Sequence, residues 1–206
     1  MKNYYMANRT DLMRFLGQSD QYEAALDVGC ASGELGRLLI EHRVATRVDG
    51  VEVNRDAAEL AKKVLRKVWV GTVEELSQDI PWESYDLVVM ADVLEHLPEP
   101  WETLDFLFAR CRPGCRLLLS VPNVRHHSVV FPLLFQGRFE YRDSGIMDRT
   151  HLHFFTRSSL QESVMRAGWK IRRASPNIKE KYRKWWYPHR LLGEFLAVQF
   201  FVLAEK

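Results

Sequence analysis

The sequence has no long hydrophobic run and few cysteines. Its longest uninterrupted apolar stretch, residues 129–135, is far shorter than the roughly 18 to 20 residues of a membrane-spanning helix, and residues 1–4 do not open a secretory signal. The three cysteines, Cys30, Cys111 and Cys115, are too few and too unevenly spaced for a disulfide framework or a four-ligand zinc site. We therefore expect a soluble protein of the reducing cytoplasm.

The chain also has no strong excess of charge of one sign. Its 29 Lys and Arg residues against 27 Asp and Glu give a net charge of +2, so there is no overall field of the kind that collects nucleic acid. Hydrophobic residues nevertheless make up 47% of the 206 residues, enough to bury a full core, which excludes intrinsic disorder. We expect one domain over residues 1–206.

The apolar pattern alternates between strand-like runs and helical spacing. Short runs predict five strands in the first part of the chain, at residues 24–28, 47–53, 67–70, 85–91 and 116–121. A helix is expected over residues 158–167, and two further strands at 169–174 and 195–204 can pair antiparallel, joined by a stretch without a clear helical period. This order predicts an α/β fold with a Rossmann-like, doubly wound, mostly parallel seven-stranded sheet and an antiparallel last strand.

The turn from the first strand to the first helix is the most informative segment. It reads Asp27-Val28-Gly29-Cys30-Ala31-Ser32-Gly33. Glycines permit close approach of the backbone to a ligand, amides at a helix start can hold an anionic group, and the Asp27 carboxylate can take a cationic one. The turn therefore suits a zwitterion. A dinucleotide-binding turn would need a second glycine where Ala31 stands, which disfavours NAD.

Acidic and polar residues at the next strand ends suit a nucleoside. Glu52 follows Asp27 at close to the roughly 20-residue interval at which a carboxylate can bind a ribose diol. Thr72 and Val73, in the loop after the third strand, could read a purine edge. Together with the zwitterion site, this predicts a ligand that joins a nucleoside to an amino acid.

The chain resembles class I S-adenosylmethionine-dependent methyltransferases, in the group of small single-domain enzymes similar to quinol-biosynthesis methyltransferases. The first motif of that group, D-x-G-C-G-x-G, is matched except at Ala31, and the segments 85–97 and 112–114 match in order. The resemblance implies S-adenosylmethionine as cofactor, with Glu52 on its ribose and the end of the fourth strand on its methionine part. The predicted cofactor-binding residues are Asp27, Gly29, Cys30, Gly33, Glu52, Val53, Thr72, Val73, Ala91, Asp92 and His96.

The segment 123–156 is less regular and suits a substrate-covering insertion. It holds four of the seven histidines, His126, His127, His151 and His153. Residues 145–156 resemble a motif that faces the active site in this group. If the acceptor is a hydroxyl, a histidine can remove its proton, and we predict His151 as that catalytic base. The alternative is that His151 only braces the loop by a hydrogen bond to the backbone.

A metal ion is the second question that the histidines raise. Asp92, Glu95 and His96 form a pattern that, in some metal-assisted O-methyltransferases, holds a divalent cation together with a distant histidine, for which His151 or His153 would serve. The same string occurs in metal-free members, and we expect no metal.

Two further segments carry weaker signals. Arg9 could meet the methionine carboxylate and Tyr5 could close the pocket. The basic and aromatic stretch 179–190 could form a lid, contact a membrane surface peripherally, or hold RNA. A structural or lid role is favoured over nucleic acid, because a short patch on a nearly neutral chain is a weak footprint.

The function predicted is O-methylation of a small aromatic or lipid-like acceptor, without DNA as a partner and with no prediction of oligomeric state. Two alternatives stay open. One is a catalytically silent S-adenosylmethionine-binding regulatory module, and the other is an RNA methyltransferase.

Overall fold

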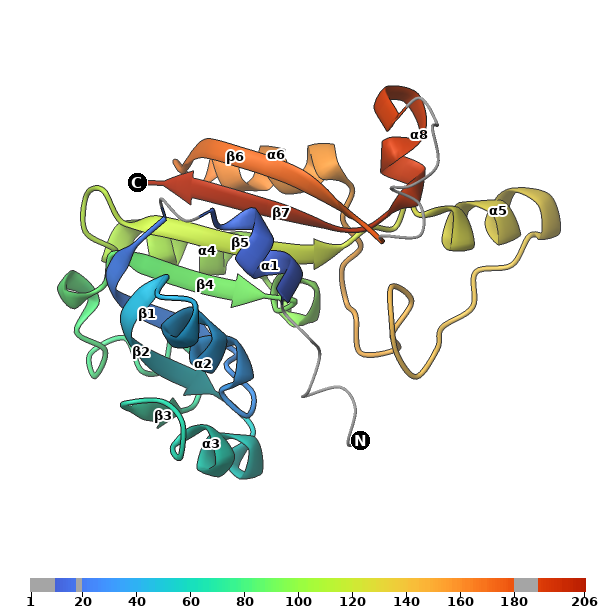
Figure 1. Ribbon diagram of the computed structural model, residues 1–206. Coiled ribbons are helices and arrows are strands. Elements are labelled where there is room, and N and C mark those ends of the chain that lie inside the picture. Colours follow the sequence, from blue (N-terminus) through green and yellow to red (C-terminus); the bar gives the residue numbers. More distant parts are fainter. Residues whose placement is uncertain (1–9, 18–19, 180–188) are drawn as a thin grey trace.

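The computed structural model describes residues 10–17, 20–179 and 189–206 and contains a seven-stranded sheet in the order β3-β2-β1-β4-β5-β7-β6 (Figure 1). The strands are β1 (Tyr22–Val28), β2 (Ala45–Glu52), β3 (Val68–Val70), β4 (Leu87–Ala91), β5 (Arg116–Pro122), β6 (Lys170–Ile178) and β7 (Ala197–Glu205). β1 to β5 pair in parallel, whereas β7 is antiparallel to both of its neighbours. The predicted α/β class, mostly parallel sheet and antiparallel last strand are confirmed.

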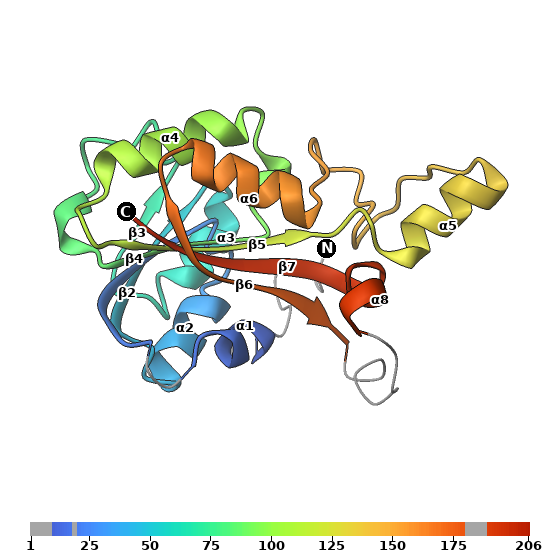
Figure 2. The same cartoon turned by 90° about the horizontal axis from the view of Figure 1, so that it is seen from above.

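Two layers of helices cover the sheet (Figure 2). One buried cluster joins the sheet to α1, α2 and α3, and a second joins its other face to α4 and α6. Every residue of β4 is buried, as expected for a central strand covered on both faces. These helices are α1 (Thr10–Phe15), α2 (Glu34–Glu41), α3 (Arg55–Ala61), α4 (Pro100–Arg110) and α6 (Arg157–Arg166).

Local side-chain contacts set where the helices begin. Asn54 caps α3, because its side chain accepts a hydrogen bond from the backbone N–H of Ala57 at 3.0 Å. Thr156 and Ser159 form a reciprocal capping box at the start of α6. Pro100 occupies the first turn of α4, where its missing N–H costs nothing. The loops before α3 and α4 follow β2 and β4, so they lie at the carboxyl edge of the sheet.

The region between β6 and β7 contains a helix that the sequence pattern did not predict. α8 (His189–Leu196) precedes β7, so Phe195 is helical and the strand begins only at Ala197. The apolar run continues from helix into strand without a polar break, which is why composition does not mark the boundary. β6 is also longer than the predicted strand and ends at Ile178.

The segment 123–156 leaves the sheet at the end of β5 and contains a second unpredicted helix, α5 (His127–Gln136). α5 extends beyond the edge of the sheet in both views (Figures 1 and 2). The rest of the segment is irregular and returns through a bridge between Asn123 and Phe155. Among the described residues, no helix has both the length and the apolar content needed to cross a bilayer.

Candidate active site

The turn after β1 follows a path that only small residues can take. Gly29 and Gly33 have φ angles of +71° and +84°, and Ala31 has +48°. A Cβ added to Gly29 would lie 2.6 Å from Cγ2 of Val93, so the backbone here packs directly against the end of β4. Gly33 provides no side-chain cap for α2. The first amides of α2 are therefore suited to bind an anionic group.

Glu52 joins the ends of β1 and β2. Its buried carboxylate accepts hydrogen bonds from the backbone N–H groups of Ala31 and Asn54, each at 2.8 Å. A carboxylate has about four acceptor positions, so two remain for a ribose diol. Asp27 is buried in the neighbouring strand, where it lies opposite Gly50, two residues before Glu52. The two acids thus lie toward the same edge of the sheet.

The other predicted adenosine contacts have varied surroundings. Val53 is 65% exposed, just beyond the end of β2. Val73 is buried in the core, and Thr72 forms a turn in which its hydroxyl accepts from the N–H of Glu75 while its own N–H donates to the Glu75 carboxylate. The Cys30 side chain is buried in the core, and burial raises the pKa of its thiol.

Asp92 follows β4 in a left-handed conformation, with φ +57°. Its carboxylate accepts from the Ser120 hydroxyl at 2.7 Å and from the Gln199 amide at 2.8 and 2.9 Å. Ala91, the preceding residue, is buried. Sequence reasoning missed Gln199, which comes from β7. The only signal is that a polar side chain interrupts an apolar run there.

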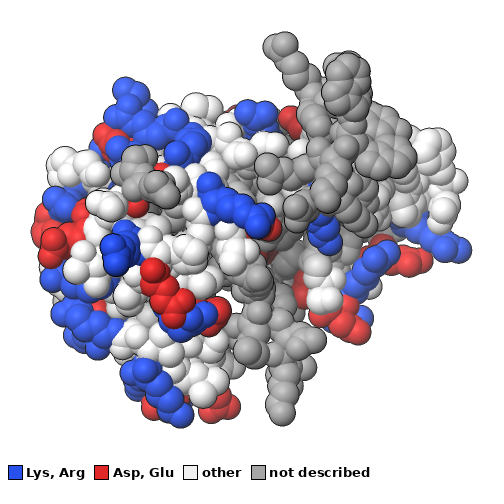
Figure 3. All heavy atoms as spheres, in the orientation of Figure 1, with Lys and Arg blue, Asp and Glu red and all other residues white. Residues whose placement is uncertain are grey.

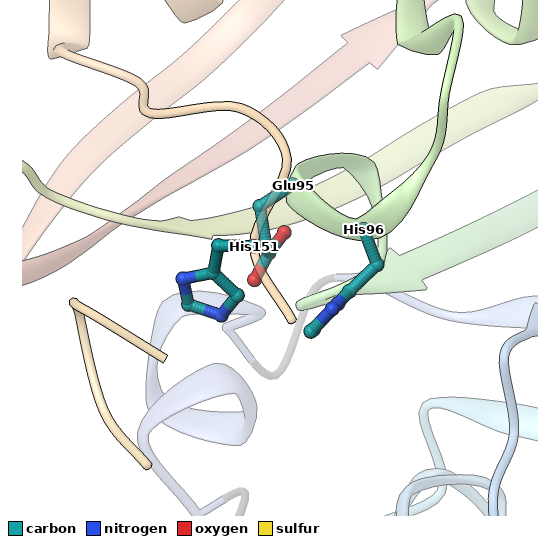
Figure 4. A group of neighbouring side chains, drawn as sticks. All are labelled: Glu95, His96 and His151. Carbon is teal, nitrogen blue, oxygen red and sulfur yellow. The ribbon is translucent and has the colours of Figure 1, made fainter. Parts of the chain in front are cut away.

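Glu95, His96 and His151 lie close together, although they come from two segments far apart in sequence (Figure 4). One ligand atom from each lies within 4.8 Å of the others, and the two imidazole rings meet edge to face with centroids 4.7 Å apart. The Glu95 carbonyl accepts from the N–H groups of Leu152 and His153, which fixes the second segment against the first. This arrangement has the donor types and spacing for a divalent cation.

The environment of His151 defines its protonation. Its Nδ1 lies 3.0 Å from the carbonyl oxygen of Ile146, so Nδ1 carries the proton that donates to this acceptor. Burial, with a contribution from nearby His96, lowers the pKa of His151 below its usual value. The ring is therefore neutral at pH 7, with an unprotonated Nε2. Asp148 holds the backbone of His151 through a 3.0 Å hydrogen bond from the His151 N–H to the Asp148 carbonyl.

The other histidines of the insertion have different surroundings. His153 contacts the Pro98 carbonyl through Nε2 at 3.0 Å and packs edge to face on Trp101. The His126 side chain caps α5. His127 packs against the ring of His126, with centroids 4.2 Å apart. Of the two candidates for a distal ligand or base, the structure therefore brings His151, rather than His153, to the Glu95 cluster.

A cavity of about 400 Å³ adjoins the end of β4, and its wall includes Asp92, Glu95 and His151. Its wall combines the strand ends, the first turn of α5 and the loop after it. The lining residues are Asp92, Glu95, Pro122, His126, Ser128, Val129, Arg142, Ser144, Gly145, Ile146, Met147, His151, Lys179, Val198 and Gln199. Predicted Asp92 and His151 therefore share one cavity, whereas Asp27 and Glu52 lie outside its wall.

The helix α5 carries an apolar surface from the cavity into solvent. Val129 is buried in the cavity wall, whereas Phe131, Leu134 and Phe135 are 51%, 69% and 75% exposed. Elsewhere the surface is mixed, and Figure 3 shows both signs of charge scattered over one face. Tyr5, Arg9 and residues 180–188, which the sequence analysis considered, lie outside the described residues.

Comparison with curated proteins shows partial similarity to one group of enzymes. The chain is 30% identical over 117 residues to a ubiquinone biosynthesis O-methyltransferase of Pseudomonas fluorescens, covering 53% of this chain and 48% of that protein. A protein of the same description from Coxiella burnetii is 25% identical over 115 residues, covering 53% and 47%. The chain spans about half the length of these curated relatives.

Solved structures share the fold over nearly the whole chain. A SAM-dependent methyltransferase from Archaeoglobus fulgidus matches with a TM-score of 0.71 at 17% identity, covering 96% of this chain and 92% of that one. An S-adenosylmethionine-dependent methyltransferase from Mesorhizobium loti gives 0.66 at 15% identity, covering 96% of each. A family model described as a methyltransferase domain matches residues 2–174. The chain therefore belongs to the methyltransferase domain family and shares its fold with these two S-adenosylmethionine-dependent methyltransferases.

Proposed function

We propose that the protein transfers a methyl group from S-adenosylmethionine to a hydroxyl of a small acceptor with an aromatic or lipid-like body. The observation that carries the proposal is the position of His151 in the wall of the cavity that also contains Asp92, at the end of β4. The similarity to ubiquinone biosynthesis O-methyltransferases over half of the chain supports transfer to oxygen.

The chain's own residues fit the cofactor. Glu52 is expected to bind the ribose hydroxyls through its remaining acceptor positions, and the open amides of α2 to bind the methionine carboxylate. Asp27 and Asp92 are expected to meet the cationic end. When bound, the cofactor supplies a methyl group that is already electrophilic. The protein therefore mainly has to align the acceptor and exclude water, a contribution of roughly 7 to 11 kcal/mol in favourable cases.

His151 is proposed as the base that makes the acceptor oxygen nucleophilic. Its Nε2 would accept the hydroxyl proton of the acceptor, and the acceptor oxygen would then take the methyl group that the bound cofactor supplies. The hydrogen bond from Nδ1 to the Ile146 carbonyl fixes the ring for this step. Because burial lowers its pKa, His151 is neutral and able to accept the proton at pH 7.

The insertion at 123–156 is proposed to cover the acceptor. Val129 and Met147 contribute apolar wall to the cavity. The exposed side chains Phe131, Leu134 and Phe135 on the same helix support a lipid-like acceptor and peripheral contact with a membrane. We also propose the cytoplasm as the location, which three unbridged cysteine thiols support.

A second mechanism is favoured by the contact of Glu95, His96 and His151. These three side chains could hold a divalent cation. Nε2 of His151 would then be a ligand rather than a base, and the acceptor oxygen would be activated by the ion. Chelation separates the two mechanisms, as discussed below.

The proposal is tested in two steps with the purified full chain. Calorimetry with S-adenosylhomocysteine should show binding at one site. A labelled-methyl screen over quinols, catechols, aromatic acids and RNA should then show transfer to a small hydroxylated acceptor. Transfer to RNA alone would support the RNA alternative, and binding without transfer to any acceptor would support the regulatory module. Either of these outcomes contradicts the proposal.

A further inference from the structure

The charges in the cavity wall are divided between two groups. Asp92 and Glu95 lie at and just after the end of β4, and both are engaged within the protein. The Asp92 carboxylate accepts hydrogen bonds from Ser120 and Gln199. The Glu95 carboxylate lies within 4.8 Å of ring nitrogens of two histidines. These acids therefore have partners before any acceptor enters.

The two cations of the wall, Arg142 and Lys179, have no such partners. Within residues 10–17, 20–179 and 189–206, neither side chain forms an ion pair. Other basic residues nearby do so, such as Arg149, which pairs with Asp143 at 2.7 Å. Arg142 belongs to the loop after α5 and Lys179 follows β6, so two separate segments bring positive charge to one cavity.

The wall therefore has two acids with partners inside the protein and two cations that form no ion pair with a described residue. Arg142 and Lys179 are exposed, so solvent screens their charges until an acceptor covers them. An acceptor with an anionic group would supply the partner that both cations lack within the described part of the chain.

We propose that the acceptor carries a carboxylate bound by Arg142 and Lys179, while its hydroxyl meets His151. The inference rests on the proposed function and names its substrate class as a hydroxylated aromatic acid. A guanidinium matches a carboxylate through two parallel N–H donors, and an ammonium adds a point charge. Apolar wall residues such as Val129, Met147 and Val198 provide contact for a flat ring between the two polar ends.

Matched probes test the charge without changing the hydroxyls. Binding of 3,4-dihydroxybenzoate and 3,4-dihydroxybenzamide is measured by calorimetry, with and without S-adenosylhomocysteine. We expect the benzoate to bind at least about tenfold more tightly. Arg142→Gln and Lys179→Gln should each reduce this preference several-fold. Arg149→Gln is the matched control, because Arg149 lies on the same loop outside the cavity wall and should leave the preference unchanged.

Equal binding of the two probes overturns the inference, as does a preference that survives in both cavity variants. Methyl transfer to the probes separates this failure from failure of the proposed function. One outcome is that the benzamide and the benzoate are methylated at equal rates that Arg142→Gln does not change. In that case the proposed carboxylate site is wrong, whereas the proposed methyltransferase function is retained. If the benzoate binds through Arg142 but no acceptor is methylated, the carboxylate site stands and the proposed function fails.

Discussion

The cofactor half and the acceptor half of the site are built in different ways. The proposed cofactor half uses the ends of β1, β2 and β4, which are adjacent in the sheet, and we expect the backbone of one turn to make its main contacts. The acceptor half gathers side chains from the ends of β4, β5 and β6, the start of β7, α5 and the loop after it. The first is encoded locally and the second depends on tertiary packing, so substitutions should affect the two halves separately.

The largest expected effect is on the acceptor half. His151→Gln should lower turnover by about 10²-fold to 10⁴-fold, because it removes the proposed base. Affinity for S-adenosylhomocysteine should stay unchanged by calorimetry. His153→Gln is the control, because His153 lies two residues away and contacts Pro98 instead of the cavity. Normal turnover of His151→Gln on the identified acceptor would show that the base assignment is wrong.

Gly29→Ala should act on the cofactor half through stability. The change combines a left-handed residue with a contact of 2.6 Å to Val93, and we expect the free energy of unfolding to fall by about 2 to 5 kcal/mol. Gly114→Ala is the matched control: φ there is +80°, but an added Cβ meets nothing within 4 Å. It should lose only about 1 to 2 kcal/mol. Urea unfolding measures both, and equal losses would contradict the close packing at Gly29.

Glu52→Gln should weaken cofactor binding without changing acceptor recognition. The amide has one oxygen and no charge where the carboxylate has two oxygens, so we expect the loss of one charge-assisted hydrogen bond to a ribose hydroxyl. At about 1.5 to 3 kcal/mol for a hydrogen bond to a charged group, affinity for S-adenosylhomocysteine should fall about 10-fold to 100-fold. Glu59→Gln, an exposed change in α3, should leave it unchanged. Unaltered binding by the Glu52 variant would remove that residue from the ribose site.

The pH dependence should belong to the acceptor half. Burial, followed by nearby His96, lowers the pKa of His151, so turnover should be flat near pH 7 and decrease only below pH 6.5. Below that pKa the rate should fall about tenfold per pH unit. The unfolded chain binds the proton more readily, so His151 also makes folding less stable as the pH falls through the same window. A rate that falls already from pH 8 to 7 would contradict a neutral base.

The smallest expected effect is that of chelation. If the site works without metal, EDTA should leave turnover and the unfolding midpoint unchanged. Loss of activity with EDTA, recovered by Mg²⁺ or Mn²⁺, would instead make Glu95, His96 and His151 a metal centre. Glu95→Gln should then abolish the recovery.

The sequence predicted where the residues of the proposed cofactor half lie in the fold, whereas their roles stay a prediction. Asp27, Gly29 and Glu52 occupy strand ends and a turn, and both follow from local periodicity and backbone conformation. Gln199 and Arg142 carry no comparable pattern, because they reach the site only through the position of β7 and of an irregular loop.

The absence of a local sequence pattern also explains why the helices α5 and α8 were not predicted. α5 is apolar along almost its whole length, so it has no polar face to reveal helical spacing. α8 runs directly into the apolar strand β7. His151 was predicted from a resemblance, and its partners Ile146 and His96 were visible only once the loop had been placed against Glu95.

The position of β7 has a consequence for how the protein acquires its site during synthesis. β7 lies between β5 and β6 in the sheet but follows both along the chain, so β6 has no neighbouring strand until β7 arrives. Gln199 on β7 also donates to the Asp92 carboxylate, beside the hydrogen bond from Ser120 on β5. The edge formed by β1, β2 and β4, where we propose that the nucleoside binds, can thus assemble before synthesis ends, whereas the cavity lined by Val198 and Gln199 is completed only after the final strand has inserted.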